Sequence, residues 1–243
     1  MLRRTGMDTY HKYAAIDIGS NAVRLLLAGV SDDESGFYQK KISWVRMPIR
    51  LGEDAFTLGY ITEEKIDQFE KTLTGFKHLI DAYSPRAQMA CATAAMRCAD
   101  NGPQICGQIL DATGIDIEII DGKQEANIIF RNKQYGSQSS QTASMIIDVG
   151  GGSTEITLFF QGRVVASKSF NIGTVRLLNN SVDKASWNKM EKWIKSRSKG
   201  YLSMEAIGSG GNINKLFRLV NGKTGVPVSY KKLRAMQHTL KDM

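Results

Sequence analysis

Two stretches of the chain share one pattern of hydrophobic and polar positions. Residues 14–30, AAIDIGSNAVRLLLAGV, and residues 145–160, MIIDVGGGSTEITLFF, each carry an apolar run, then Asp-x-Gly, then small polar residues, then a second apolar run. Small residues between two continuous apolar runs predict a β-hairpin whose strands are buried on both faces. Because the pattern occurs twice, we predict that the chain contains two related halves.

The segments between these two stretches alternate between helical and extended patterns. Residues 62–82 place apolar side chains at helical spacing, with Thr62 as a candidate N-cap and two glutamates in the first turn. The further predictions are a strand at 88–92, a helix at 94–112 interrupted at 101–103, a strand at 115–120, and a capping box at 121–124 that starts a helix to about residue 134. This alternation indicates an α/β lobe.

A polar stretch, YGSQSSQTAS at residues 135–144, is the predicted linker between the two halves. We therefore predict an N-terminal lobe over residues 1–134 and a C-terminal lobe over residues 135–243. After the second hairpin we predict a strand at 163–170, a helix at 184–199, a strand at 204–207, a glycine turn at 208–211 and a helix from about Ser229. The last helix reaches the end of the chain without a cap or a closing strand, so we expect the second lobe to be truncated.

The composition is that of a globular protein without a membrane anchor. Hydrophobic residues make up 42% of the 243 residues and charged residues 23%, and no apolar run is long enough to span a bilayer. The first residues lack a secretory pattern, and the three cysteines have no CxxC spacing. We expect a cytoplasmic protein that does not associate with membranes.

The net charge of +8 is unevenly distributed. Residues 184–243 hold 13 Lys and Arg against 3 Asp and Glu, a net charge of +10, so the rest of the chain sums to −2. A concentrated positive field favours polyanionic partners, because it raises the rate at which they arrive. Solvated lysines on amphipathic helices are the alternative interpretation, and the sequence leaves it open.

The Asp-x-Gly bends suggest a specific chemistry. Each places a carboxylate beside backbone N–H groups that no Cβ shields. Two such bends and the later Gly208-Ser-Gly-Gly211 turn could clamp a phosphate chain with its divalent cation. Mg²⁺ prefers one or two carboxylates together with phosphate oxygens, a role that Asp17 and Asp148 could fill. The alternative is that the glycines serve only tight turns.

Five ordered motifs together resemble the exopolyphosphatase and guanosine pentaphosphate phosphohydrolase (Ppx/GppA) family. The motifs are DIGSNAVR at 17–24, TAAMRCADN at 93–101, GKQEA at 122–126, DVGGGSTE at 148–155 and GSGG at 208–211. They span almost the whole chain. The resemblance implies a duplicated, two-lobed α/β fold of the actin-like (ribonuclease H-like) type.

The resemblance also implies roles for individual residues. Glu125 matches the catalytic glutamate that deprotonates the attacking water, Glu155 a second catalytic acid near the water or the metal, and Arg97 an arginine that binds phosphate and offsets transition-state charge. The implied metal carboxylates are Asp148 and Asp17. The implied phosphate-binding residues are Ser20, Asn21, Arg24, Gly150, Gly151, Gly152, Ser153, Thr154, Gly208, Gly210 and Gly211.

Ordinary structural roles remain open for three of these residues. Glu125 could be a first-turn glutamate that interacts with the helix dipole, Arg97 a helix arginine facing solvent, and Arg24 a solvent-facing strand residue. The chain also departs from the family pattern at Ala22, where a hydroxyl residue is usual, and at Gln124, where the first of two glutamates is usual. The departure at Ala22 removes one side-chain donor. The departure at Gln124 should be tolerable if the second glutamate, Glu125, does the chemistry.

Taken with its motifs, the chain is expected to be a Mg²⁺-dependent hydrolase. It would remove terminal phosphate from polyphosphate or pppGpp. Its expected partners are polyphosphate or guanosine penta- and tetraphosphate. We expect no specific nucleic-acid partner and allow for a homodimer. Two alternatives are a nucleotide- or alarmone-binding module that hydrolyses poorly and, less favoured, an ATP-dependent kinase of the same superfamily.

Overall fold

The computed structural model describes residues 10–33, 36–122, 124–125, 127–128, 142–161, 163–223 and 226–241. The chain forms two compact units: the first comprises residues 1–125 and 175–181, and the second residues 126–174 and 182–243. The predicted boundary after residue 134 lies outside the described residues. Of the predicted linker, residues 142–144 belong to a strand.

A five-stranded sheet in the order β3-β2-β1-β4-β5 organises the first unit. Its first three strands form an antiparallel meander, and β4 and β5 continue parallel to β1. The strands are β1 His11–Ile18, β2 Val23–Asp33, β3 Gly36–Met47, β4 Ala87–Ala92 and β5 Ile117–Ile119. The helices are α1 Leu51–Thr57, α2 Glu63–Tyr83, α3 Ala94–Cys98 and α4 Gly102–Thr113.

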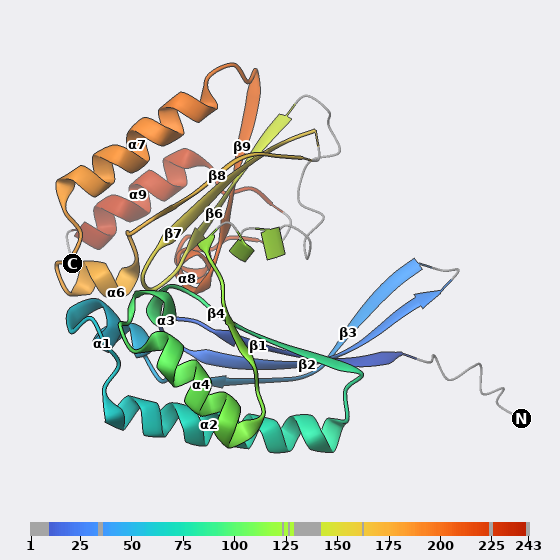
Figure 1. Cartoon of the computed structure of the whole chain (residues 1–243). Coiled ribbons are helices and arrows are strands. Elements are labelled where there is room, and N and C mark those ends of the chain that lie inside the picture. The colour runs from blue at the N-terminus through green and yellow to red at the C-terminus, as the bar shows by residue number, and fades with distance from the viewer. Residues whose placement is uncertain are drawn as a thin grey trace, which may run out of the picture. The chain divides into compact units, whose positions relative to one another are not determined.

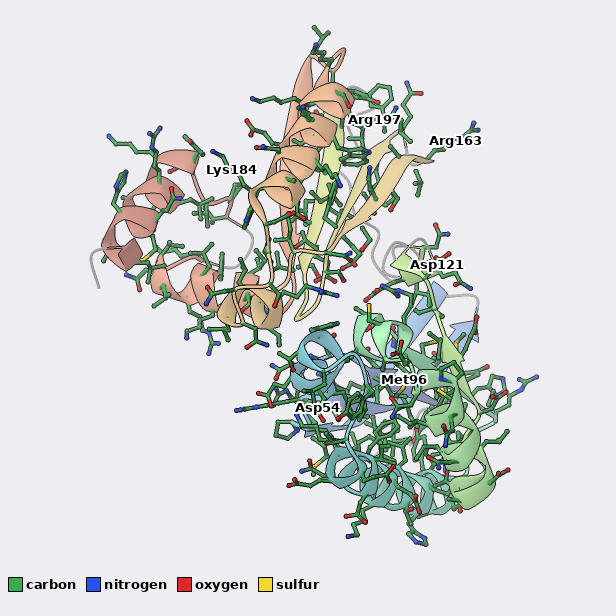
Figure 2. The ribbon with its side chains drawn as sticks, turned by 60° about the vertical axis from the view of Figure 1, so that its left-hand side comes forward. Asp54, Met96, Asp121, Arg163, Lys184 and Arg197 are labelled. Atoms are coloured by element: carbon green, nitrogen blue, oxygen red, sulfur yellow. The ribbon has the colours of Figure 1, made fainter. Side chains whose placement is uncertain are left out.

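Helices α2 and α4 lie on one face of this sheet (Figure 1). The apolar face predicted for α2 is buried there, and Phe69 and Leu73 are fully buried. Burial of each such side chain contributes about 1.5–3 kcal/mol. Met96 of α3 points into the same interior (Figure 2) and is 1% exposed. Because Ile16 and Ile18 of β1 are buried, Asp17 between them lies on the opposite face of the sheet.

The second unit repeats this topology with a four-stranded sheet in the order β8-β7-β6-β9. Strands β6, β7 and β8 form an antiparallel meander, and β9 runs parallel to β6. The strands are β6 Thr142–Val149, β7 Thr154–Phe160, β8 Arg163–Phe170 and β9 Ser203–Ser209. The helices are α7 Lys184–Ser198, α8 Gly211–Leu219 and α9 Tyr230–Lys241. The order β8-β7-β6-β9 matches β3-β2-β1-β4, which confirms the prediction of two related halves.

Helix α7 covers the core of the second unit with one face. Met190, Trp193 and Ile194 pack against buried residues of the sheet, and Asp183 caps the helix by accepting a 2.7 Å hydrogen bond from the N–H of Ser186. Helix α6, Thr174–Leu178, begins in the second unit, and its remaining residues belong to the first.

Several elements differ from the sequence predictions. The patterns did not predict β3, α1, α6 or α8, and the strand predicted at 115–120 is limited to Ile117–Ile119. Thr62 precedes α2 as predicted, but its hydroxyl donates to Asp54 at 2.6 Å and does not cap the helix. The helix predicted after residue 121 is present at Gly122, Gln124 and Glu125, and its part beyond residue 128 lies outside the described residues.

No helix within the described ranges combines the length and the hydrophobicity needed to cross a membrane.

Candidate functional site

The two predicted hairpin turns have the same backbone geometry. In the first, four residues link the paired Ile18 and Val23, and the Gly19 N–H donates to the Ala22 carbonyl at 3.1 Å. In the second, four residues link Val149 and Thr154, and the Gly150 N–H donates to the Ser153 carbonyl at 2.9 Å. The register therefore pairs Asp17 with Arg24 and Asp148 with Glu155 at equivalent positions.

In the first turn, Asp17 and Arg24 form an ion pair. The Arg24 Nη1 atom donates to Asp17 Oδ2 at 2.5 Å, and the Asp17 side chain is 54% exposed. Arg24 therefore contacts the aspartate of the turn motif, Asp17, and is not merely a solvent-facing strand residue. A metal ion at Asp17 would compete with this guanidinium, so the role of Asp17 as a metal ligand stays a prediction that this ion pair disfavours.

A segment that the sequence did not single out supports the first turn. The Arg50 N–H donates to the Asn21 carbonyl at 3.1 Å, and the Gly52 N–H donates to the Ser20 carbonyl at 2.8 Å. Arg50 has the left-handed φ of 59°, which non-glycine residues rarely adopt. The available sequence signal was Gly52, where an added Cβ would lie 2.8 Å from Ser20 Cβ. Ser20 is buried, whereas Asn21 is exposed.

The start of α3 lies beside the first turn, because the Thr93 N–H donates to the Ile18 carbonyl at 3.1 Å. Arg97, one turn further along α3, is half-buried and donates from Nη1 to the Ile120 carbonyl at 2.6 Å. The structure thus gives Arg97 a structural hydrogen bond near the carboxyl ends of β4 and β5. It is not the solvent-facing helix arginine of the alternative interpretation.

The predicted capping box before Glu125 is present. The Asp121 N–H donates to Gln124 Oε1 at 2.9 Å, and the Gln124 N–H donates to Asp121 Oδ1 at 2.7 Å. The Glu125 N–H donates to the Asp121 carbonyl at 3.0 Å, which places half-buried Glu125 in the first helical turn. Gln124 forms this cap as well as a glutamate would, so the departure at Gln124 leaves the geometry of Glu125 intact.

In the second unit, the structure brings the predicted carboxylates together. Asp148 pairs with Glu155 on one side and with Ser209 of β9 on the other. Glu155 is 5% exposed, and its Oε1 atom accepts a 2.8 Å hydrogen bond from the Ser169 hydroxyl. Directly paired residues of antiparallel strands have Cβ atoms about 4.5–5.5 Å apart. The carboxylates of Asp148 and Glu155 therefore share one face of the sheet.

The later glycine motif lies beside the second turn but is only partly a turn. Gly210 has a φ of 95°, and an added Cβ would lie 2.8 Å from Asp148 Oδ1, so this position requires glycine. Gly211 begins α8. Gly208 is a strand residue of β9, where an added Cβ would lie 2.6 Å from Ile213 Cγ2. The prediction of a turn over 208–211 is therefore corrected to a strand end followed by a helix start.

The second turn also has a support that the sequence did not single out. The Thr174 N–H donates to the Gly150 carbonyl at 3.1 Å, and the Thr154 hydroxyl donates to the Ile172 carbonyl at 2.6 Å. An added Cβ at Gly173 would meet the Gly151 carbonyl oxygen. The Thr154 hydroxyl thus has a structural partner, and its role in phosphate binding stays a prediction.

A sequence model of the Ppx/GppA phosphatase family matches residues 30–203. The chain belongs to this family. It is 34% identical over 198 residues to a bifunctional 3-dehydroquinate synthase/phosphatase of Fusobacterium nucleatum, which covers 76% of this chain and 30% of that protein. It is 32% identical over 174 residues to exopolyphosphatase 2 of Mycobacterium tuberculosis, with 68% of this chain and 53% of that protein covered. The chain thus spans about half or less of these relatives.

Solved structures of the family extend the likeness to nearly the whole chain. A family member from Aquifex aeolicus matches with a TM-score of 0.76 and 25% identity over 97% of this chain and 80% of that chain. An exopolyphosphatase from Cytophaga hutchinsonii matches with a TM-score of 0.77 and 23% identity over 95% of this chain and 80% of that chain. The two-lobed, actin-like α/β fold that the sequence predicts is confirmed.

The donor set of this Ppx/GppA chain fits Mg²⁺ better in the second unit than in the first. In the described part of the chain, no group of three or more His, Cys, Asp or Glu side chains is close enough together to hold a metal ion. Mg²⁺ takes one or two carboxylates and completes its coordination with water and phosphate oxygens. Asp148 and Glu155 supply two carboxylates on one face, whereas Asp17 is already paired with a cation.

A thiol lies on the strand next to Asp17. Cys91 of β4 pairs with Asp17 in the parallel register. Burial raises the pKa of the Cys91 thiol, and the negative charges of Glu118 and Asp17 raise it further. Only the thiolate is an effective nucleophile, so Cys91 is poorly suited to covalent catalysis near neutral pH.

Proposed function

We propose that this chain carries the phosphate-binding and catalytic residues of a hydrolase that removes terminal phosphate from polyphosphate or pppGpp. The observation that carries this proposal is the pair of matched Asp-x-Gly turns, which have the same internal hydrogen bond and are both held by backbone contacts. A preorganised turn stabilises developing charge without reorganising during the reaction. Family membership supports the reaction class.

The two units carry different groups that suit a phosphate substrate and its metal ion. In the first unit, exposed Asn21 and the guanidinium of Arg24 bind phosphate oxygens, and Arg97 offsets charge in the transition state. In the second, the start of α8 at Gly211 offers N–H groups to an anion. Bound Mg²⁺, held by Asp148 and Glu155, would neutralise phosphate charge.

Glu125 is the proposed general base. It lies in the first turn of a helix, near the carboxyl end of β5, and its carboxylate would orient and deprotonate the attacking water. The Glu125→Gln variant should retain substrate binding and lose activity by roughly 100- to 10,000-fold. Phosphate release from polyphosphate and from pppGpp measures both substrates in one assay.

Glu64→Gln is a matched control for this experiment. Glu64 is an exposed glutamate in the first turn of α2, so it shares the interaction with the helix dipole but not the site. Equal rates for wild type and Glu125→Gln would remove Glu125 from this role. Equal losses in Glu64→Gln and Glu125→Gln would assign the effect to helix stability.

The basic surface of the second unit favours polyphosphate as the substrate. Helix α7 exposes a series of cations, with Lys184 and Arg197 near its two ends (Figure 2). A longer anion would interact with more of this positive field than a nucleotide would. The ratio of kcat/KM for polyphosphate to that for pppGpp should therefore fall as salt rises.

Two features suggest the alternative of a binding module with weak hydrolysis: Ala22 and the truncation that the sequence led us to expect. The structure bears on Ala22 alone. The Ala22 side chain is 1% exposed and its carbonyl accepts the Gly19 N–H within the turn. A buried position is a poor place for a phosphate donor, so Ala22 does not favour this alternative.

A further inference from the structure

Glu155 has a hydroxyl partner whose position is fixed by the sheet. Ser169 of β8 pairs directly with Glu155 of β7, so the two side chains share one face. The Ser169 hydroxyl donates to Glu155 Oε1 at 2.8 Å. Glu155 is 5% exposed, and a buried carboxylate requires hydrogen-bond donors because it has lost its water.

We infer that Ser169 is a positioning residue for Glu155. A hydroxyl that holds Oε1 restricts rotation of the carboxylate and thereby fixes the direction of its second oxygen. Groups that orient a ligand in this way commonly change metal affinity or activity by about 10- to 100-fold when they are removed. The inference rests on the function proposed above and adds a residue that lies outside every motif of the resemblance.

The first unit shows that the fold itself does not require a serine at this place. The equivalent residue of β3 is Arg46, which pairs with Arg24 just as Ser169 pairs with Glu155. A guanidinium accepts no hydrogen bond, so a serine would have nothing to donate to at Arg24. The hydroxyl is present in the unit whose turn carries the buried glutamate.

A second hydroxyl on the same strand provides a matched control. Ser167 lies two residues before Ser169 and therefore on the same face, and its Oγ lies 2.9 Å from Thr157 Oγ1. Replacing Ser167 by alanine removes a hydrogen bond of similar length from the same pair of strands. It leaves Glu155 and its partner untouched.

The test compares Ser169→Ala, Ser169→Thr and Ser167→Ala in phosphate release, in Mg²⁺ binding by calorimetry without substrate, and in crystal structures. Ser169→Ala should lower kcat and weaken Mg²⁺ binding by about 10- to 100-fold, with KM changed about twofold or less. Ser169→Thr keeps the hydroxyl and should restore both values. Ser167→Ala should leave both within about twofold of wild type, although its Tm falls as much as that of Ser169→Ala.

The crystal structures decide the inference independently of activity. The Glu155 carboxylate should change its rotamer in Ser169→Ala and keep it in Ser167→Ala. An unchanged Glu155 in Ser169→Ala, or equal losses in the two alanine variants, would overturn the positioning role. Absence of phosphate release in the wild type would instead contradict the proposed function, while the crystal structures would still test the role of Ser169.

Discussion

The two hairpin turns have matching backbones but side chains of opposite character. We compare two rows of residues that are paired across neighbouring strands and that contain Asp17 or Asp148. Each row takes one residue from each strand, in the orders β3-β2-β1-β4 and β8-β7-β6-β9. The first row is Arg46, Arg24, Asp17 and Cys91, and the second row is Ser169, Glu155, Asp148 and Ser209. The first row has two arginines for one acid, and the second has two acids flanked by serines.

Under the proposed function, this difference would assign different tasks to the two turns. A row rich in guanidinium groups suits phosphate oxygens, and a pair of carboxylates suits a divalent cation. Only the aspartate at the end of the first strand of each unit, Asp17 or Asp148, is common to both rows. The aspartate thus marks the turn in both units, and we propose that its cross-strand neighbour decides what the turn can bind.

Among the tests of this comparison between the two rows, the largest expected effect comes from replacing the two aspartates separately. Asp148→Asn should lower Mg²⁺-dependent phosphate release by roughly 100- to 1,000-fold, because it removes one of the two carboxylates proposed to hold the metal. Asp17→Asn should cost about 10-fold or less and leave the Mg²⁺ concentration for half-maximal activity unchanged, since Arg24 keeps its charge. Phosphate release measured across a Mg²⁺ titration checks both values.

The outcome of that titration also decides between two assignments of the metal. If both variants need equally raised Mg²⁺, the two aspartates share the ion, as the sequence predicted. If only Asp148→Asn does, the ion belongs to the second row. Asp67→Asn, on the exposed face of α2, is a suitable control, because Asp67 forms its ion pair with Lys71 of the same helix.

The segments that support the two turns, at Gly52 and at Gly173, should differ in how well they tolerate the methyl group of an alanine. An added Cβ at Gly173 would meet backbone, the Gly151 carbonyl, whereas at Gly52 it would first meet the Phe56 ring and Ser20 Cβ. Side chains can move more readily than backbone, so Gly173→Ala should destabilise by about 3 kcal/mol and Gly52→Ala by about 1 kcal/mol. Denaturant unfolding measures both. A larger loss in Gly52→Ala would mean that the first turn is the more rigid.

The turns themselves could be predicted because their information is local. The eight-residue segments Asp17–Arg24 and Asp148–Glu155 each encode a strand end, a four-residue bend and a strand start. The capping box at 121–124 is likewise contained in four residues, and it formed as predicted. Local patterns of this kind give the fold class and the position of the candidate site.

The hydrogen bonds that support the two turns could not be predicted. They are made by backbone atoms, and they join segments that are distant in the sequence. The carbonyl of Ser20 is bonded by Gly52, and that of Gly150 by Thr174, and a carbonyl carries no sequence signal. The hydrogen bond from Ser169 to Glu155 depends on the register of two strands. The patterns also assigned the Thr62 hydroxyl to a helix cap. In the structure this hydroxyl donates its hydrogen bond to buried Asp54, eight residues earlier. Tertiary contacts decide such cases.

The two supports should also differ in their sensitivity to acid. Buried Asp54 of α1 (Figure 2) accepts hydrogen bonds from the N–H and hydroxyl of Thr62, which precedes α2, and pairs with Lys65 of α2 at 3.4 Å. Lys65 in turn donates to the carbonyl of Arg50, whose N–H holds the first turn. The backbone contacts described for the second turn, at residues 172–174, use no ionised side chain.

Although burial raises the pKa of Asp54, the hydrogen bonds from Thr62 and the charge of Lys65 together lower it below its ordinary value of 3.8. A lowered folded-state pKa stabilises the protein above pH 3.8, and this stabilisation is lost as pH falls through the folded-state pKa. Asp54→Asn should therefore destabilise by about 1–2 kcal/mol at pH 7, because an amide replaces a hydrogen-bonded carboxylate. The difference from wild type should shrink below pH 3.8. Urea unfolding at pH 7, 5 and 3 measures the difference in unfolding free energy between wild type and Asp54→Asn. A difference that stays constant with pH would show that the charge of Asp54 does not support the first turn.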